Sequence, residues 1–357
     1  MASRQSLYMN QGEGEESYAS NSMFQSTVQN RMKPAIEEVV NCLWKSTKSC
    51  SSVVIADLGC SSGPNALALV SMAVDAIHRY AVDEQIPPEL CLLLNDLPDN
   101  DFNNVAKNLV AFQESAQSIG HVLTGIVPGS FYKRLFTSSS LHLVLTSTSV
   151  HWLSEAPEDL REKGIPMYDG EDDLRQARRP LVLEAYARQF RKDFTLFLNL
   201  RAQELVPGGQ MVISLPGTCA GDLTCQSILL WDAIAFILND MASKGVITRE
   251  KLDSFYIPMY GPSDKELRDI IQDENSFTIN KMQVQELIDS MDKGSITPKM
   301  MALTTRAVFE PMMMQHFGQV EAVEEFVRSM EWHLNAGTPQ VSAPGVVSLC
   351  VSLTKKI

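Results

Sequence analysis

Residues 53–65, which read VVIADLGCSSGPN, constrain the fold of this chain more than any other segment. Apolar β-favouring residues lead into Asp57, and a loop of small residues then opens a helix. This order is typical of a buried parallel strand that passes into a nucleotide-binding turn. We expect Gly59 and Gly63 to let the backbone pass where a side chain would collide with a ligand. We expect Pro64 in the first turn of the helix, where its missing N–H costs nothing.

The loop indicates the kind of ligand that it could hold. It is neither a GxGxxG fingerprint nor a P-loop, because the Gly-Lys-Ser/Thr of a P-loop is missing. Asp57, an acidic residue at the strand end, would also repel phosphates. A cationic or neutral nucleoside therefore fits better, and S-adenosylmethionine, a sulfonium without a phosphate, is the candidate cofactor. Taken alone, the segment also fits an ordinary glycine-rich turn.

Composition bounds the class of protein. A chain of 357 residues with 45% hydrophobic and 20% charged residues predicts one large or two smaller globular domains. The net charge of −13 argues against nucleic acid or an anionic membrane surface as partner. The seven cysteines form no CxxC pair, which favours reduced thiols over disulfides or a zinc site. With a polar N-terminus and no apolar run of ~20 residues, we expect a cytoplasmic protein.

Strand-like and helix-like patterns alternate along the chain. Beyond the strand–loop–helix unit at 53–80, strands are expected at 91–94, 122–127, 141–146 and 210–215, with 346–353 as a final antiparallel strand. Helices are expected at 28–45, 102–116 and 181–205, and the charged stretch 168–179 is expected to be a solvated loop or helix end. This alternation predicts an α/β fold with a doubly wound sheet.

Three stretches rich in Met, Trp and aromatic residues do not fit that sheet. We expect them to form a mostly helical cap, roughly 150–180, 218–264 and 290–340, over the carboxyl ends of the strands. Ligands bind at those ends in such sheets. The core would then comprise roughly 28–150, 181–217, 265–290 and 345–357. Residues 1–27 would form an N-terminal arm over the active site, and the whole chain, 1–357, would be a single functional unit.

Polar and aromatic residues follow the predicted strands. Asp96 ends the second strand, where an acidic residue of a Rossmann-type sheet binds ribose hydroxyls; a turn aspartate is the alternative. Ser130 and Phe131 could bond and stack on adenine, or form a plain turn whose Phe enters the core. His151 and Trp152 could offer N–H donors at the rim, or be structural. No GxSxG or HExxH motif supports a hydrolase or a zinc enzyme.

Further ordered motifs accompany these residues: Met9, Gly12, Gly14, Glu15, Ser17-Tyr18, Asn21-Ser22, Asn95-Asp96-Leu97-Pro98, Asn100-Asp101-Phe102-Asn103, Pro128-Gly129-Ser130-Phe131-Tyr132, His151-Trp152-Leu153-Ser154, Gln189-Phe190, Arg201, Glu204-Leu205-Val206-Pro207-Gly208-Gly209 and Arg306-Ala307-Val308. Together they make the chain resemble, nearly end to end, the plant SABATH family of small-molecule carboxyl methyltransferases and related N-methyltransferases. The resemblance implies a Rossmann-like class I methyltransferase sheet.

The resemblance also implies a set of site residues. Cofactor contacts fall at Tyr18, Ser22, Asp57, Gly59, Cys60, Asn65, Asp96, Leu97, Ser130, Phe131 and Ser147. The substrate pocket falls at Asn10, Gln25, Thr148, His151, Trp152 and Trp231. Family members that methylate acids hold the carboxylate with a Gln amide and a Trp indole N–H, which makes Gln25 and Trp152 the expected catalytic residues. The implied product cofactor is S-adenosyl-L-homocysteine, and the family's frequent homodimers make a homodimer an expectation.

Elementary chemistry agrees with methylation of a carboxylate. A carboxylic acid with a pKa near ~4 is ionised at neutral pH and needs no general base. The protein must align the reactants and exclude water, and positioning alone can be worth ~7–11 kcal/mol. Neutral donors such as Gln25 and Trp152 suit this step, because an Arg clamp would bind the ground-state charge just before it disappears.

Departures from the family pattern bear on the substrate. Salicylate-specific members carry Lys, Tyr and Met where this chain has Asn10, Thr148 and His151, and residues 147–152 look more like those of jasmonate methyltransferases. Thr148 opens volume, so we expect a small lipophilic plant acid that is jasmonate-like, with benzoate-, salicylate- or anthranilate-like acids also open. N-methylation of a purine alkaloid and a non-catalytic small-molecule-binding relative are the alternatives.

A metal is not expected to function here. Some family members show one near the segment that matches residues 253–256, but Tyr256 stands where they carry Asn.

Overall fold

A seven-stranded sheet organises the computed structural model, which describes residues 7–46, 52–81, 89–115, 121–218, 226–286, 296–341 and 347–357. The strands are β1 (Ser52–Leu58), β2 (Glu89–Asp96), β3 (Val122–Pro128), β4 (Leu141–Ser147), β5 (Leu205–Pro216), β6 (Phe277–Glu286) and β7 (Val347–Lys355). Their order is β3-β2-β1-β4-β5-β7-β6. β1 to β5 are parallel, and β7 lies antiparallel between β5 and β6. The strand order reverses between β1 and β4, which places a ligand crevice beyond their carboxyl ends.

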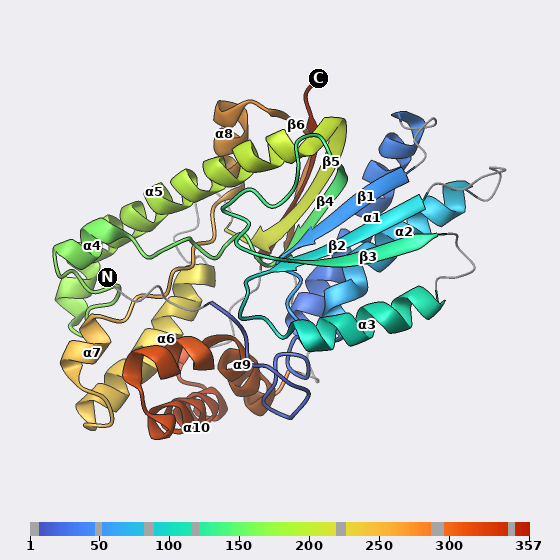
Figure 1. Cartoon of the computed structure of the whole chain (residues 1–357). Coiled ribbons are helices and arrows are strands. Elements are labelled where there is room, and N and C mark those ends of the chain that lie inside the picture. Colours follow the sequence, from blue (N-terminus) through green and yellow to red (C-terminus); the bar gives the residue numbers. More distant parts are fainter. Residues whose placement is uncertain are drawn as a thin grey trace.

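The sheet separates two apolar cores. Consecutive strand residues point to opposite faces, so Ile55 and Val212 enter one core while Ala56 and Ile213 enter the other. The first core is covered by α1 (Met23–Ser46), α2 (Ala68–Ala81) and α3 (Phe102–Ser115). The second lies under α5 (Asp172–Glu204) and α8 (Asp264–Glu274), as Figure 1 shows. Apolar strands buried on both faces explain why residues 53–58 and 90–94 read as near-continuous apolar runs.

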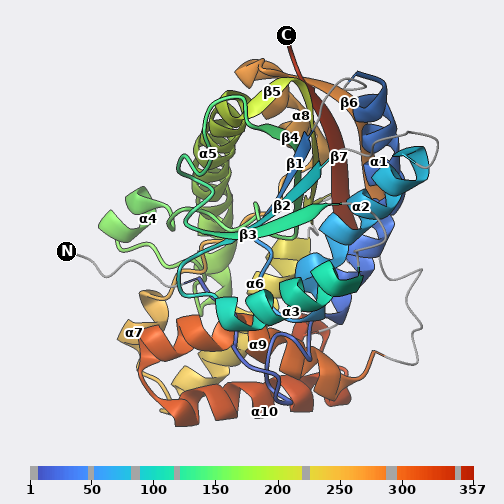
Figure 2. The same ribbon diagram turned by 45° about the vertical axis from the view of Figure 1, so that its right-hand side comes forward.

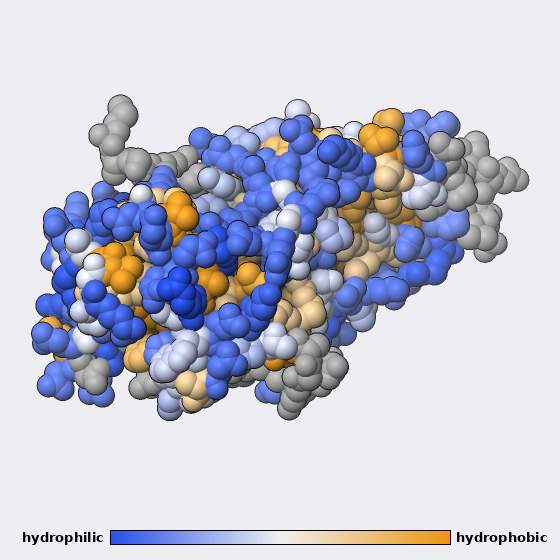
Figure 3. Space-filling model, turned by 90° about the horizontal axis from the view of Figure 1, so that it is seen from below, coloured by the Kyte–Doolittle hydropathy of each residue, from blue (hydrophilic) through white to orange (hydrophobic). Residues whose placement is uncertain are grey.

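A second group of helices lies beyond the carboxyl ends of the strands (Figures 1 and 2). It contains α6 (Gln226–Ser243), α7 (Arg249–Asp253), α9 (Pro298–Phe317) and α10 (Val320–Ala336), while the short α4 (Glu158–Glu162) lies beside α5. Local signals set their starts: Thr297 caps α9 by accepting from the Met300 N–H. The outer face of this group is mostly hydrophilic, with small separate hydrophobic areas (Figure 3). This arrangement confirms the predicted α/β sheet with a mostly helical cap.

Several element boundaries differ from the sequence prediction. α5 begins at Asp172 rather than 181, so most of the charged stretch 168–179 is helical. α1 begins at Met23 rather than 28. β6 was not predicted, because its polar residues alternate weakly and it forms an edge strand exposed to solvent. Pro64 does open the first helical turn, as expected, in the 3-10 helix η1 (Pro64–Leu67).

Parts of several predicted segments lie outside the described residues: 1–6 of the N-terminal arm, 47–51, 82–88, 116–120 and 287–290 of the core, 219–225 and 290–295 of the cap, and 345–346 before the last strand. The described helices include none with the length and apolar character that would let it cross a membrane.

Candidate functional site

A cavity of about 280 Å³ opens at the carboxyl ends of β1, β2 and β4. The N-terminal arm, the start of α1 and the loops after β1 to β4 provide its walls. The lining residues are Leu7, Tyr8, Met9, Tyr18, Gln25, Gln29, Gly59, Cys60, Ser61, Asn65, Asp96, Leu97, Pro98, Asp99, Asn100, Ser130, Phe131, Tyr132, Ser147, Thr148, Ser149, Trp152, Leu153 and Ser154. Most of the residues expected from the sequence to form a site therefore meet around one cavity.

The loop after β1 is shaped by close packing within the protein. The N–H groups of Gly59 and Cys60 both donate to the Asn95 carbonyl, at 2.9 and 3.0 Å, and tie this loop to β2. Gly59 has a φ of +78°, and a Cβ there would lie 2.3 Å from Ser149 Oγ. A Cβ on Gly63, with a φ of +80°, would lie 2.6 Å from Ala19 Cβ.

These contacts give a second reason for the two glycines. Besides the clearance for a ligand expected from the sequence, a side chain at either position would collide with neighbouring protein. Gly59 makes room for the loop after β4, and Gly63 makes room for the N-terminal arm. Both glycines thus allow separate parts of the chain to converge on the cavity.

Two carboxyl groups, the buried Asp57 and the half-buried Asp96, give this end of the cavity its electrostatic character. Asp96 accepts hydrogen bonds from the Ser61 N–H at 2.6 Å and the Leu97 N–H at 2.7 Å. Burial nevertheless raises the pKa of Asp96 to about 6, against the lowering effect of those two bonds. The pKa of Asp57, directly behind the loop, is raised by burial and by the nearby charge of Asp96.

The described lining residues offer no cation to these acids. They include Asp96 and Asp99 but no Lys, Arg or His. An ionised carboxylate in such a place gains from a ligand that brings positive charge or donor hydrogens. The site therefore favours a cationic or donor-rich ligand over a phosphate.

Unpartnered acceptors also face this region. The side-chain oxygens Gln25 Oε1, Gln29 Oε1 and Ser61 Oγ are buried and have no hydrogen-bond partner within the described part of the chain. All three residues line the cavity. Buried polar atoms are nearly always paired, so these atoms are suited to donors from a bound molecule. A cofactor with an ammonium group and ribose hydroxyls fits this donor requirement.

Gln29 is a lining residue that the sequence prediction missed. Its exposed fraction is 7%, and its Nε2 donates to the Asn65 carbonyl at 3.3 Å, which leaves Oε1 without a partner. It follows Gln25 by one helical turn on α1, so the two amides share a helix face. This spacing is the signal that could have revealed it.

The N-terminal arm is joined to the loop of β1 by Asn65. Its side-chain amide donates to Ser22 Oγ at 2.8 Å and to the Ser22 carbonyl at 2.9 Å. Ser22 is thus buried behind Asn65 rather than in the wall, whereas Tyr18 of the same arm lines the cavity.

The loops after β3 and β4 form the opposite wall. The Phe131 ring meets Tyr132 and Phe197 edge-on, with centroids 4.8 and 5.9 Å apart. The Tyr132 hydroxyl donates to the Trp152 carbonyl at 2.7 Å, which joins the two loops. Thr148 has a φ of +53°, a strained conformation for a β-branched residue, and its N–H donates to the Ser214 carbonyl at 2.8 Å.

The residues expected to bind the acceptor fall into two groups. Gln25, Thr148 and Trp152 line the cavity, and the Trp152 ring lies 5.9 Å from that of Phe309 on α9. Asn10 does not line it, because its amide donates to Glu310 Oε2 at 2.6 Å and to the Glu16 carbonyl at 3.2 Å.

His151 and Trp231 also lie outside the cavity walls. His151 is buried behind Trp152, at 5.2 Å between ring centroids, and its Nδ1 has no partner within the described residues. Burial lowers the pKa of His151 to about 3, so this imidazole is neutral at physiological pH. Trp231 packs on Tyr186 at 4.5 Å between ring centroids, away from the cavity.

Comparison with known proteins adds three findings. A family model described as SAM dependent carboxyl methyltransferase matches residues 4–356. Caffeine synthase 3 of Camellia sinensis is 39% identical over 325 residues, 87% of each chain, and jasmonate O-methyltransferase of Arabidopsis thaliana is 38% identical over 362 residues, covering 90% of this chain and 92% of the relative. A solved structure of loganic acid methyltransferase with SAH superimposes with a TM-score of 0.85 at 30% identity, covering 98% of this chain and 99% of that one.

Proposed function

Because this chain belongs to the family of S-adenosylmethionine-dependent carboxyl methyltransferases, we propose that it converts the carboxylate of a small lipophilic acid to its methyl ester. The protein is an S-adenosylmethionine-dependent methyltransferase with the class I methyltransferase fold. The proposal therefore concerns the acceptor and the roles of the cavity residues.

We infer that the loops after β1, β2 and β3 hold the cofactor. Asp96 would accept from ribose hydroxyls, and Phe131 and Ser130 would contact the adenine. The unpartnered oxygens of Gln29 and Ser61 support this assignment, since each can accept from donors of the cofactor. When bound, S-adenosylmethionine supplies a methyl group on a sulfonium that an oxygen nucleophile can displace in line.

One observation carries the choice of a carboxylate acceptor: apart from Asp96 and Asp99 at the end of β2, the described cavity walls combine neutral polar groups with apolar ones and contain no Lys, Arg or His. Gln25 and Trp152 offer N–H donors, beside Leu7, Met9 and Leu153. A carboxylate arrives already ionised, so it needs orientation and exclusion of water but no base. Neutral donors orient its oxygens without stabilising the ground-state charge as strongly as a guanidinium would.

The purine alternative is less well supported by these walls. Methylation of a ring N–H requires loss of a proton, and a general base works best with a pKa near the operating pH. His151, the nearest imidazole in sequence to the acceptor residues, has its pKa lowered to about 3 and does not line the cavity. Asp96, with a pKa of about 6, does line it, but we assign this carboxyl to the ribose of the cofactor. The similarity to caffeine synthase 3 nevertheless makes purine substrates a necessary arm of the test.

The size of the acceptor is inferred from Thr148. A threonine offers a smaller packing surface at this position than an aromatic ring would, and its strained backbone holds it at the cavity wall. We therefore expect a bulkier, non-planar acid such as jasmonic acid to be preferred over salicylic or benzoic acid.

The test is a substrate panel with purified protein and methyl-labelled S-adenosylmethionine. It contains jasmonic, loganic, salicylic, benzoic and anthranilic acids together with xanthosine and methylxanthines. Labelled product that alkali or an esterase cleaves supports an ester, because an N-methyl group survives both treatments. Efficient methylation of xanthines without any acid would overturn the proposal, and efficient methylation of salicylate with none of jasmonate would overturn the inference on size.

Two variants test the assigned donors. Trp152→Phe removes the indole N–H and keeps an aromatic ring, so kcat/KM for the acid should fall about 10–100-fold, as for a lost hydrogen bond to a charged group. Gln25→Ala should act in the same direction, and neither should change the KM for S-adenosylmethionine as strongly. Trp332→Phe, at a residue that is 63% exposed on α10, is the matched control.

A further inference from the structure

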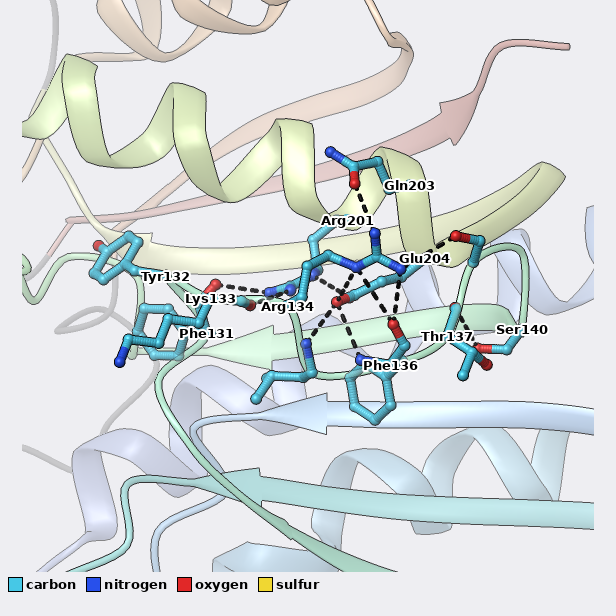
Figure 4. Close-up of polar contacts among 12 residues, drawn as sticks. Phe131, Tyr132, Lys133, Arg134, Phe136, Thr137, Ser140, Arg201, Gln203 and Glu204 are labelled. Atoms are coloured by element: carbon cyan, nitrogen blue, oxygen red, sulfur yellow. Dashed lines mark hydrogen bonds and ion pairs between the residues drawn. The ribbon is translucent and has the colours of Figure 1, made fainter.

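Two residues at the end of α5 form a completely buried ion pair. Arg201 Nε lies 2.7 Å from Glu204 Oε2, and both side chains have an exposed fraction of 0%. Figure 4 shows them between the end of α5 and the loop of residues 131–136. Desolvation offsets much of the attraction in such a pair, so stability alone is a weak reason for its presence.

The other donor and acceptor groups of Arg201 and Glu204 form hydrogen bonds with the backbone of that loop. Arg201 Nη1 donates to the Phe131 carbonyl at 2.8 Å, and Nη2 donates to the Lys133 carbonyl at 3.1 Å. Glu204 Oε1 accepts from the Leu135 N–H at 2.8 Å and the Phe136 N–H at 3.1 Å. The pair thus fixes four backbone groups within a segment that has neither helical nor strand hydrogen bonds.

The segment fixed in this way carries a wall of the cavity. Ser130, Phe131 and Tyr132 line it, and the Phe131 ring rests edge-on against Phe197. The Arg201 guanidinium lies 5.3 Å from the centroid of the same Phe197 ring. Arg201 therefore supports Phe131 in two ways. It donates directly to the Phe131 carbonyl, and it packs on the Phe197 ring against which the Phe131 ring rests.

We propose that Arg201 and Glu204 are positioning residues for the cofactor: they hold residues 131–136 so that Phe131 keeps its place in the cavity wall. The planar guanidinium suits this role, because its fixed fork donates to two carbonyls and a carboxylate at once. Neither residue lines the cavity, so both act through the loop. The inference rests on the proposed cofactor role of Ser130 and Phe131.

The experiment compares Arg201→Lys with the double variant Arg201→Met/Glu204→Leu. Lysine keeps the charge beside Glu204 but offers a single ammonium, which cannot replace the whole fork. The double variant removes both charges, so no unpaired buried charge is left behind, but it frees the loop backbone. Thermal unfolding checks that each variant is folded, and Arg201→Lys keeps the test informative if the double variant is not.

Steady-state kinetics and calorimetric binding of S-adenosylhomocysteine give the decisive readout. The KM for S-adenosylmethionine and the Kd for S-adenosylhomocysteine should rise about tenfold. This change in affinity corresponds to the net contribution of about one hydrogen bond. The kcat and the acceptor KM should stay within about twofold of the wild-type values. A general loss of structure would change these two constants as well. Arg188→Ala, on the exposed face of α5 where Arg188 pairs with Glu184, should leave all four values unchanged.

Phe131→Leu separates failure of this inference from failure of the cofactor assignment. If Phe131→Leu weakens cofactor binding and the folded Arg201 and Glu204 variants do not, the positioning role is wrong and the cofactor assignment stands. If Phe131→Leu also leaves cofactor binding unchanged, the assignment of this wall fails, and the positioning role fails with it.

Discussion

The side-chain amide of Asn65 donates to both the hydroxyl and the carbonyl oxygen of Ser22, at 2.8 and 2.9 Å. Ser22 immediately precedes α1, and Asn65 lies in η1, the short helix that follows the loop after β1. One buried amide therefore fixes the end of the N-terminal arm to the sheet. The cavity wall that contains Tyr18 and Gln25 depends on this junction.

Replacement of Asn65 by alanine should loosen that junction. The change removes both hydrogen bonds to Ser22, whose carbonyl keeps only the Ser26 N–H at 3.0 Å among the described residues. We expect a loss of about 1–3 kcal/mol in unfolding free energy, as for two hydrogen bonds, and a raised KM for S-adenosylmethionine. Urea unfolding and steady-state kinetics measure the two effects. Asn335→Ala is the control, because within the described part of the chain that exposed amide donates only to the Glu331 carbonyl of its own helix. Equal behaviour of the two variants would contradict the role given to Asn65.

Alanine at Gly59 should be destabilising for two separable reasons. Its φ of +78° is unfavourable for a side chain, and the new Cβ would lie 2.3 Å from Ser149 Oγ. We expect a loss of about 2–4 kcal/mol, measured by urea unfolding.

Gly208→Ala provides the matched control for Gly59→Ala. Gly208 has a φ of +76° but open space around the position of a Cβ, so it reports the backbone cost alone. The difference between the two variants then measures the contact with Ser149. Addition of Ser149→Gly to Gly59→Ala should recover part of that difference, and no recovery would place the strain elsewhere.

The stability of the cofactor-free protein should depend on pH through Asp96. Burial raises its pKa from 3.8 to about 6, so the folded state favours the neutral acid. This contribution is fully present below pH 3.8 and is lost as pH rises through about 6, and it amounts to at most about 3 kcal/mol. Asp57, whose pKa burial also raises, acts in the same direction.

Asp96→Asn isolates this contribution. The unfolding free energy of wild type minus that of Asp96→Asn should fall as the pH rises from 4 to 7, because only the wild type must ionise this half-buried acid in the folded state. Chemical unfolding of both proteins at several pH values gives the difference. A flat difference for Asp96→Asn would mean that this carboxyl titrates near its ordinary value.

His151 should not appear in the pH profile of activity. Burial lowers its pKa to about 3, so the imidazole stays neutral from pH 5 to 8, where an ordinary histidine would titrate. The profile of kcat/KM should therefore keep its shape in His151→Asn even if its height changes through packing against Trp152. A limb near pH 6–7 that disappears in this variant would show that His151 titrates during turnover.

Local patterns were sufficient where one segment carries the whole signal. The run into Asp57, the small-residue loop and Pro64 predicted β1 and the helical turn after it, and the structure confirms both. The polar edge strand β6 was missed because alternation is weak where both faces meet solvent. Gln29 was missed as a cavity residue because its spacing of one helical turn from Gln25 was not used, and a helix spacing alone does not say which face meets a cavity.

The sequence by itself predicted an α/β fold from the alternation of strand and helix patterns, because these patterns are short-range features of the chain. Its ordered motifs identified the methyltransferase family through their resemblance to that family. Only the tertiary structure decided which residues share a cavity. Gly59 meets Ser149, Asn65 holds Ser22, and Arg201 supports Phe131, each across a long stretch of chain. It also set the pKa values of Asp96 and His151, since burial and nearby charge depend on packing that no local pattern encodes.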